Sequence, residues 1–281
     1  MSQAQDPFAW VAEARRTLAE EFGPRAERAL DRWPLAVDEV TLGGVACQRL
    51  LPKEEAPRAT LLYFFGGGHM SGAPEYDLPI TAPLCVQAQL QIIAPRYALA
   101  PERPFPAALV QAEAVWEAMC ETLDTPPLLA GESAGGNLAL GLVTSLLAQG
   151  KSGPARLALL SPWCDMTPDG IAASAGIDDP SLSPDQIAPC AQAYLQGHDP
   201  ADPRASPGAG ALAGHWPRTH MTTGSRDVLR PGVLAMAEKL RAAGAQVRVT
   251  DTPGMWHVFE VYDELPEAGV SLAQIAAFLR P

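Results

Sequence analysis

The stretch that decides the fold is Leu128-Leu129-Ala130-Gly131-Glu132-Ser133-Ala134-Gly135. Its first three residues predict a strand buried on both faces, because a short unbroken apolar run is typical of such a strand. Residues 137–147 place leucines at helical spacing and predict a helix. Between the two lies G-x-S-x-G, in which the serine occupies a strained strand-to-helix turn and the glycines leave room for the crossing backbone. This context predicts Ser133 as a nucleophile, although the five-residue pattern alone also fits a glycine-rich helix start without chemistry.

The same alternation of buried strand and helix recurs along the chain, and it is the signature of a parallel sheet covered on both faces. A hairpin of alternating apolar residues is expected at 36–50, with its turn at Gly43-Gly44. Apolar runs occur at 59–65, 90–94, 128–130, 157–160, 220–223 and 247–250, and helical patterns at 75–88, 106–123, 134–149, 231–243 and 264–279. The fold class predicted is α/β, with a mostly parallel central sheet flanked by helices.

Two segments lie outside this alternation. Residues 7–31 predict one or two amphipathic helices, interrupted at Gly23-Pro24. Residues 164–216 are rich in Pro, Asp, Gly and Ala and contain one helical stretch near 184–196. An insertion of this length between two strands is more often a lid or a functional excursion than a plain connection. We expect a single domain over residues 1–281.

The composition excludes several function classes. A net charge of -12 argues against a nucleic-acid partner and against anionic membranes, and it favours neutral substrates. No segment approaches the roughly 18 apolar residues of a membrane span, and the first residues lack the pattern of a secretory signal. The five cysteines are widely spaced and match no zinc site or disulfide framework, so we expect buried free thiols, no metal and a cytoplasmic protein.

A glycine-rich loop suits the stabilisation of a negatively charged oxygen. Gly66-Gly67-Gly68 follows the apolar run at 59–65 directly. In α/β-hydrolases such a loop donates a backbone N–H to the oxyanion, and the residue after the serine, here Ala134, donates another. A flexible glycine turn is the alternative, whereas a phosphate-binding loop is disfavoured because no Lys-Ser or Lys-Thr pair follows.

The expected chain order of the remaining catalytic groups is an acid followed by a histidine. Of the five histidines only His257 lies after all predicted strands, in a turn before the last helix. Such turns at the carboxyl ends of strands carry the functional groups of α/β sheets. The other histidines are predicted to be surface or packed residues: His69, His198, His215 and His220.

The acid is predicted to be Asp227, which follows the strand ending at Thr223 and would hold the histidine tautomer. The rival is Asp251, at the end of the next strand. Asp165 and Asp178 fit less well, since they precede the insertion or fall inside it.

Several motifs, in the family's order, resemble the bacterial hormone-sensitive lipase family of carboxylesterases. Residues 97–108 are similar to its Y-R-L-A-P-E-x-P-F-P-A-A block, residues 131–136 to G-[DE]-S-A-G-G, residues 161–167 to S-P-W-x-D-L-T, residues 202–207 to D-P-x-x-S-P, and residues 254–259 to G-x-x-H-x-F. The resemblance implies hydrolysis of short- to medium-chain esters without a cofactor. It implies oxyanion donors at Gly67, Gly68 and Ala134, and a helical cap formed by about 1–33 and 164–216.

Two positions depart from the family. Phe65 stands where H-G-G-G has its histidine, which puts the conformation of the loop in question. Ala98 stands where the arginine of Y-R-L-A-P-E is expected, while Arg96 precedes Tyr97, so the usual ion pair must be absent or rebuilt.

We therefore predict a serine carboxylesterase that acts on a small neutral ester through Ser133, His257 and Asp227, as a monomer or homodimer. A lactonase or an amide deacylase would use the same triad, because the cap and pocket choose the leaving group. A non-catalytic small-molecule receptor on the same fold is the alternative from another class.

Overall fold

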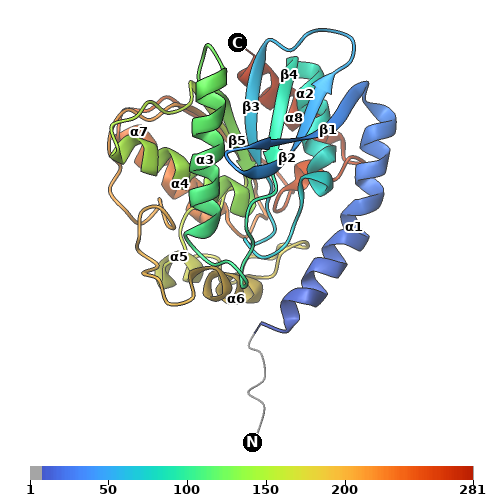
Figure 1. Cartoon of the computed structure of the whole chain (residues 1–281). Coiled ribbons are helices and arrows are strands. Elements are labelled where there is room, and N and C mark those ends of the chain that lie inside the picture. The colour runs from blue at the N-terminus through green and yellow to red at the C-terminus, as the bar shows by residue number, and fades with distance from the viewer. Residues whose placement is uncertain (1–7, 281) are drawn as a thin grey trace, which may run out of the picture.

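A single eight-stranded sheet forms the centre of the computed structural model, which describes residues 8–280 (Figure 1). The strand order is β1-β2-β4-β3-β5-β6-β7-β8. Strands β3 to β8 pair in parallel, whereas β2 pairs antiparallel with β1 and β4, so the predicted mostly parallel sheet is confirmed. The strands are β1 Leu35–Leu42, β2 Val45–Pro52, β3 Ala59–Phe64, β4 Leu90–Pro95, β5 Leu128–Glu132, β6 Arg156–Leu160, β7 Arg218–Gly224 and β8 Val247–Thr252.

The β1–β2 hairpin turns at Gly43-Gly44, as predicted. Leu42 pairs with Val45, and both glycines have positive φ, of 56° and 76°. A two-residue turn that matches the twist of the flanking strands requires positive φ at both central residues, which glycine adopts without a steric penalty.

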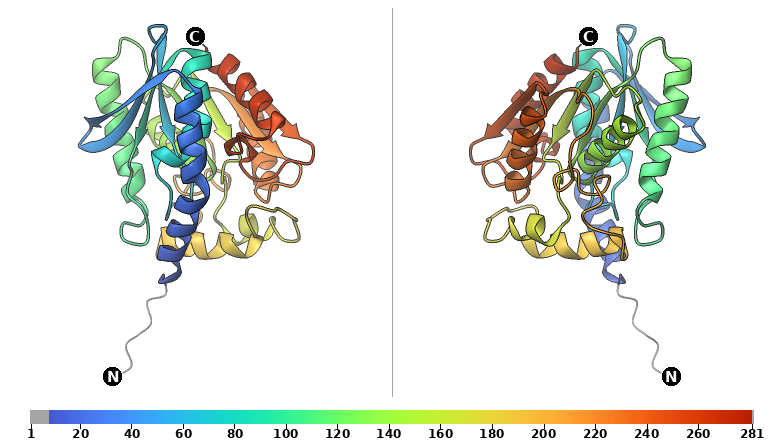
Figure 2. Two further views of the ribbon diagram at one scale, coloured as in Figure 1. Left: turned by 90° about the vertical axis from the view of Figure 1, so that its right-hand side faces the viewer. Right: turned by 90° about the vertical axis from the view of Figure 1, so that its left-hand side faces the viewer.

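Helices cover both faces of the sheet. Helices α2 and α8 pack against each other, as do α3 and α4, and Figure 2 shows α3 and α8 on opposite sides of the strands. The helix predicted at 75–88 begins as a 3₁₀ turn over Pro74–Asp77. The α-helices are α1 Trp10–Arg32, α2 Leu78–Ala88, α3 Ala107–Thr122, α4 Ser133–Ala148, α5 Pro168–Ala172, α6 Pro184–Leu195, α7 Arg230–Ala242 and α8 Pro266–Leu279, and a second 3₁₀ turn spans Phe259–Val261.

Helix α1 continues through Gly23-Pro24, so the interruption expected there is wrong. Proline removes one helical N–H donor, which leaves the carbonyl of Glu20 without its usual partner. Both Glu20 and Pro24 are exposed, so that carbonyl is open to solvent. The opposite face of α1 buries Val11, Ala26 and Ala29, and this packing holds the helix together across the proline. Residues 1–7, which belong to the predicted cap and to the stretch tested for a secretory signal, lie outside the described residues.

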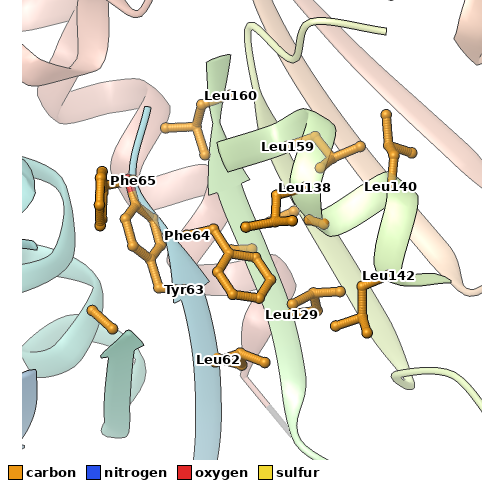
Figure 3. Packing of buried hydrophobic residues seen from close by; sticks show 14 of the residues in the cluster. Leu62, Tyr63, Phe64, Phe65, Leu129, Leu138, Leu140, Leu142, Leu159 and Leu160 are labelled. Atoms are coloured by element: carbon orange, nitrogen blue, oxygen red, sulfur yellow. The ribbon is translucent and has the colours of Figure 1, made fainter. Parts of the chain in front are cut away.

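The core lies between the central strands and helix α4. Figure 3 shows Phe64 of β3 beside Leu129 of β5 and Leu138 of α4, all almost fully buried. Burial of each such side chain contributes about 1.5–3 kcal/mol. This packing fixes the start of α4, and hence the position of Ser133, against the ends of β3 and β5.

The cysteines are free, as predicted, but they are not all buried. Cys47, Cys85, Cys164 and Cys190 are buried, whereas Cys120 is exposed. The expectation of burial is wrong at Cys120 because this residue lies on the outer face of α3.

Between residues 8 and 280, no helix is long and apolar enough to cross a bilayer.

Candidate active site

Four loops meet at the carboxyl edge of the sheet. They carry Gly66 after β3, Ser133 after β5, Asp227 after β7 and His257 after β8. Because these strands are parallel, residues far apart in sequence come together at one edge, which is where open α/β sheets bind ligands. The sheet therefore brings together the three loops that carry the predicted triad and the glycine loop.

Ser133 occupies a strained turn with a φ of +51°, in the left-handed region that non-glycine residues rarely adopt. The flanking glycines are required by close backbone contacts. A Cβ at Gly131 would lie 2.4 Å from the carbonyl oxygen of Gly135, and a Cβ at Gly135 would lie 2.1 Å from the carbonyl oxygen of Phe64. The turn exists because two of its five residues have no side chain, and it presents the Ser133 hydroxyl at the edge of the sheet.

The three predicted triad residues are joined by hydrogen bonds. His257 Nε2 lies 2.9 Å from Ser133 Oγ, and His257 Nδ1 lies 3.0 Å from Asp227 Oδ1. The Asp227 carboxylate also accepts hydrogen bonds from the backbone N–H of Leu229, at 2.9 Å, and from the hydroxyl of Thr223, at 2.8 Å. These bonds orient the carboxylate toward the imidazole.

The rival acid is placed elsewhere. Asp251 Oδ2 accepts hydrogen bonds of 2.9 and 2.7 Å from Arg230, and it makes no contact with His257 among the hydrogen bonds of residues 8–280. Asp178 pairs with Arg226 at 2.7 Å. Asp165 accepts from the backbone N–H of Thr167. Asp227 is therefore the only one of the four candidate acids in contact with the imidazole in the described part of the chain.

The Asp227 carboxylate and the His257 imidazole each stabilise the charged form of the other. Burial alone would lower the pKa of His257, but the Asp227 carboxylate outweighs it and the pKa lies above the ordinary 6.5. Burial likewise opposes ionisation of Asp227, yet the charge and hydrogen bond of His257 hold the pKa of that carboxyl below its usual value. Asp227 thus remains ionised and faces an imidazole that gains stability on protonation.

The four remaining histidines are packed or exposed, as predicted. His220 Nε2 lies 3.0 Å from Thr250 Oγ1, inside the sheet, and His198 packs edge-on against Phe105. His215 is exposed. His69 is fully buried and its ring stacks on Tyr194 of α6, with ring centroids 3.8 Å apart.

The glycine loop keeps its backbone N–H groups available despite the phenylalanine before it. Within residues 8–280 no protein acceptor takes a hydrogen bond from the N–H of Gly67, Gly68 or Ala134. The loop turns back on itself, since the Gly67 carbonyl accepts from the Ser71 N–H at 3.0 Å and from the Ser71 hydroxyl at 2.8 Å. A Cβ at Gly67, whose φ is +103°, would lie 2.4 Å from the carbonyl oxygen of Ser71.

Phe65, which stands where the H-G-G-G motif has its histidine, packs by stacking. Its ring lies parallel to that of Tyr97, with centroids 4.2 Å apart, and the Tyr97 hydroxyl donates to the Phe65 carbonyl at 2.5 Å. The departure at Ala98 is compensated by Arg96, which pairs with Glu75 and Glu39. An arginine ion pair is therefore present in this region, but it is made by Arg96, two positions before Ala98.

Sequence reasoning missed the buried polar network behind the glycine loop. His69 Nε2 lies 3.1 Å from Asn137 Oδ1, and the amide of Asn137 donates at 2.8 Å to the carbonyls of Trp163 and Ala205. Burial lowers the pKa of His69 to about 3, so its ring is neutral. The network connects the glycine loop to α4 and to the 164–216 insertion, a connection that no sequence motif indicates.

A cavity of about 650 Å³ opens beside Ser133 and His257. Helices α1 and α6 line it opposite the sheet, and Figure 2 shows the lower end of α1 reaching the level of α6. Arg15 ties α1 to the rest of the site, since its guanidinium donates to the Met70 carbonyl at 2.7 Å and pairs with Glu102 at 2.7 Å.

The cavity walls are apolar with a negative bias. Its lining includes five acidic residues and, within residues 8–280, neither lysine nor arginine: Glu13, Glu21, Asp77, Glu132 and Asp185. Two of these acids, Asp77 and Glu132, are buried. Burial raises the pKa of Asp77 to about 7, and burial together with Asp77 raises the pKa of Glu132 well above its usual value. Burial thus opposes the charged form of both inner acids, while the acidic side chains at the exposed mouth disfavour anions.

Comparison with known proteins agrees with this geometry. The family described as alpha/beta hydrolase fold matches residues 61–261, most of the chain. The chain belongs to the α/β-hydrolase family. One relative of this α/β-hydrolase is an acetyl-hydrolase of Streptomyces hygroscopicus, 33% identical over 248 residues that cover 86% of this chain and 82% of the relative.

Solved structures narrow the family further. An esterase from the bacterial hormone-sensitive lipase family superposes with a TM-score of 0.84 at 25% identity, covering 100% of this chain and 99% of the other. The hormone-sensitive lipase homologue EstE7, from a metagenome library, has a TM-score of 0.83 at 29% identity and covers 99% and 98%. The resemblance of this α/β-hydrolase to the bacterial hormone-sensitive lipase family, seen in its motifs, is confirmed.

Proposed function

We propose that this α/β-hydrolase is a serine carboxylesterase of short- to medium-chain esters, with Ser133 as nucleophile, His257 as base and Asp227 as the orienting acid. The observation that carries the proposal is the 2.9 Å contact between His257 Nε2 and Ser133 Oγ, with Asp227 behind the imidazole. The relatives' names support the reaction class, since they are esterases and acetyl-hydrolases.

The reaction proceeds in two acyl-transfer steps. Ser133 Oγ attacks the ester carbonyl while His257 Nε2 takes the hydroxyl proton, and the resulting oxyanion accepts hydrogen bonds from the N–H groups of Gly67, Gly68 and Ala134. Collapse releases the alcohol, which receives its proton from His257. A water molecule then attacks the acyl-enzyme as His257 takes its proton, and the carboxylic acid leaves with Ser133 restored.

Helices α1 and α6 act as the cap that limits the substrate. The chain-length test is a series of p-nitrophenyl esters from acetate to palmitate, together with a lactone and an anilide. We expect kcat/KM to be highest between acetate and octanoate, because a cavity of about 650 Å³ holds a small ligand. A monosuccinate ester should react more slowly than butyrate, because the charged residues that line the mouth, among those the structure describes, are acidic. A maximum on palmitate, on the lactone or on the anilide would contradict the proposed substrate class.

The oxyanion donors are tested by Gly67→Ala. The added Cβ meets the Ser71 carbonyl at 2.4 Å and the residue would keep an unfavourable φ of +103°, so the loop must move. We expect kcat to fall about 10²–10³-fold, the usual effect of losing one oxyanion donor. The matched control is Gly44→Ala, which has a similar φ of +76° but nothing within 4 Å of the new Cβ. It should lower stability by about 1–2 kcal/mol and leave kcat unchanged; equal loss of kcat in both variants would argue against the loop's role.

The pH profile follows from the charge of His257. The imidazole must be neutral to accept the Ser133 proton, and the Asp227 carboxylate holds its pKa above 6.5. Activity should therefore be lost on acidification at a higher pH than for an ordinary histidine. Initial rates at low substrate concentration between about pH 5 and 9 report kcat/KM for the free enzyme, with circular dichroism to confirm folding at each pH. An acid limb below 6.5 would contradict this charge balance.

The proposal extends to a cytoplasmic protein that is a monomer or a homodimer. Five unpaired thiols, four of them buried, favour a reducing compartment. Light scattering coupled to size exclusion measures the assembly directly.

A further inference from the structure

One acidic side chain outside the triad contacts both loops that carry the triad's acid and base. Asp179 lies in the insertion, just before α6. Its Oδ2 accepts a hydrogen bond of 3.0 Å from the backbone N–H of Val228 and another of 3.0 Å from the backbone N–H of His257. Val228 directly follows Asp227, so a single oxygen holds the backbone next to the acid and the backbone of the base.

These contacts differ from those that shape the loop of Asp179 itself. Its other oxygen, Oδ1, accepts from the N–H and hydroxyl of Ser181, at 2.8 and 2.9 Å, and from the N–H of Leu182 at 3.2 Å. Such local bonds are those of an ordinary aspartate turn. The bonds of Oδ2, by contrast, span 49 and 78 residues of sequence. A turn alone would not need them.

The geometry of the triad depends on the distance between two separate loops. Asp227 follows β7 and His257 follows β8, and the Nδ1–Oδ1 hydrogen bond of 3.0 Å is a direct link between their side chains. Hydrogen bonds to an ionised acceptor are about twice as strong as neutral ones. A carboxylate shared by the two backbones therefore restrains the separation of the loops even when the imidazole exchanges its proton during turnover.

We propose that Asp179 is a positioning residue of the catalytic site, which holds the Asp227 and His257 loops in register and fastens them to the segment leading into α6. The inference rests on the proposed function. Two contacts join the His257 loop to the insertion. Besides the bond from the His257 N–H to Asp179, the Ser181 hydroxyl lies 3.3 Å from the His257 carbonyl oxygen. Helix α6 lines the cavity, so this short segment connects a wall of the cavity to the His257 loop.

Asp179 also adds negative charge near the imidazole. Against the burial that lowers it, the pKa of His257 is raised by Asp227 first, and further by Asp179 and Glu260. The nearby cations already have partners, since Arg226 pairs with Asp178 and Arg230 with Asp251. Loss of the Asp179 charge should consequently lower the pKa of His257.

The test is Asp179→Asn, compared with Asp178→Asn in the full-length protein on p-nitrophenyl butyrate. Asparagine keeps the size of the side chain but replaces one acceptor oxygen by a donor, so it cannot accept at both oxygens. We expect kcat to fall about 10- to 100-fold, the effect of a small misplacement of catalytic groups, with KM changed little. The acid limb of kcat/KM should move to lower pH.

Asp178 is a matched control because it carries the same charge one residue away. Its side chain is 92% exposed and pairs only with the half-exposed Arg226 among the ion pairs of residues 8–280. Exposed pairs contribute little to stability, so Asp178→Asn should keep kcat within about twofold and leave the acid limb in place. Asp179→Glu retains the charge but displaces the oxygens, so it should lower kcat while keeping the acid limb close to that of the wild type.

The outcomes separate positioning from simple stabilisation. If Asp179 only braces the insertion, Asp179→Asn lowers the melting temperature while the folded enzyme keeps the wild-type kcat and acid limb, and the inference is overturned. It is equally overturned if Asp178→Asn has the same effect.

Ser133→Ala, measured in parallel, tests the proposed function separately. If Ser133→Ala remains active, the assignment of the triad fails. If Ser133→Ala is inactive and Asp179→Asn is fully active, the positioning role alone is rejected. Should Asp179→Asn not fold at the assay temperature, assays at lower temperature give the same comparison, and Asp179→Glu tests the expected loss of kcat.

Discussion

Ser133→Ala is expected to lower kcat on p-nitrophenyl butyrate by about 10⁵-fold or more. The variant loses the only hydroxyl in contact with His257 Nε2 in the described part of the chain. Without it no acyl-enzyme forms, and only the oxyanion donors and substrate binding remain to accelerate direct attack by water. Steady-state rates with freshly purified protein, and single-turnover assays for any residual burst, measure the loss.

A fluorophosphonate probe gives an independent readout, because it reacts with activated serines and not with ordinary hydroxyls. The wild type should be labelled stoichiometrically and Ser133→Ala not at all. Ser152→Ala is the control, since Ser152 is exposed before the amino end of β6, away from the site; its labelling should equal that of the wild type. A wild type that resists the probe would favour a non-catalytic receptor, and a labelled Ser133→Ala would place the nucleophile elsewhere.

Asp227→Asn is expected to lower kcat by about 10⁴-fold while the fold is retained. Asparagine is nearly isosteric, but its amide can donate to Nδ1 and so stabilise the tautomer that carries its proton on Nε2. That tautomer cannot accept the Ser133 proton. The loss of the carboxylate charge also removes the main stabilisation of the imidazolium that forms during the reaction.

Asp251→Asn provides the matched control, because Asp251 was the rival acid in the sequence and undergoes the same chemical change. Its partner is Arg230, at 2.7 Å and partly exposed to solvent. Weak surface pairs contribute about 0–1 kcal/mol, so kcat should stay within about twofold of the wild type. Comparable losses in the two variants would mean that the two acids share the role, and a loss confined to Asp251→Asn would reverse the assignment.

Most of the sheet could be predicted from the sequence because strands buried on both faces are short, unbroken apolar runs. The apolar runs at 59–65, 128–130 and 157–160 became β3, β5 and β6 with boundaries shifted by only a few residues. The strained turn at Ser133 was predictable because the G-x-S-x-G pattern lies within five adjacent residues. Its two glycines are required by close backbone contacts, one inside the turn at Gly131 and one with the Phe64 carbonyl of β3 at Gly135.

Features that depend on contacts between residues far apart in the sequence were predicted wrongly or not predicted. The break expected at Gly23-Pro24 did not occur, since packing of the inner face of α1 outweighs the loss of one hydrogen bond. Nothing in the sequence indicated that His69 supports the glycine loop through Asn137, or that Asp179 contacts Val228 and His257. In each case the partners are separated by tens of residues and share no motif.

The sequence by itself determined the class of fold and predicted the chain order of the proposed nucleophile, acid and base, because local spacing encodes strands, helices and the strained turn at Ser133. Only the tertiary structure shows which of Asp227 and Asp251 contacts His257. In the structure Asp227 follows β7, whereas Asp251 lies within β8. The direction of each side chain distinguishes them: one carboxylate lies 3.0 Å from the imidazole and the other pairs with Arg230. That difference depends on how the loop after β7, strand β8 and the His257 loop pack together, which no single segment determines.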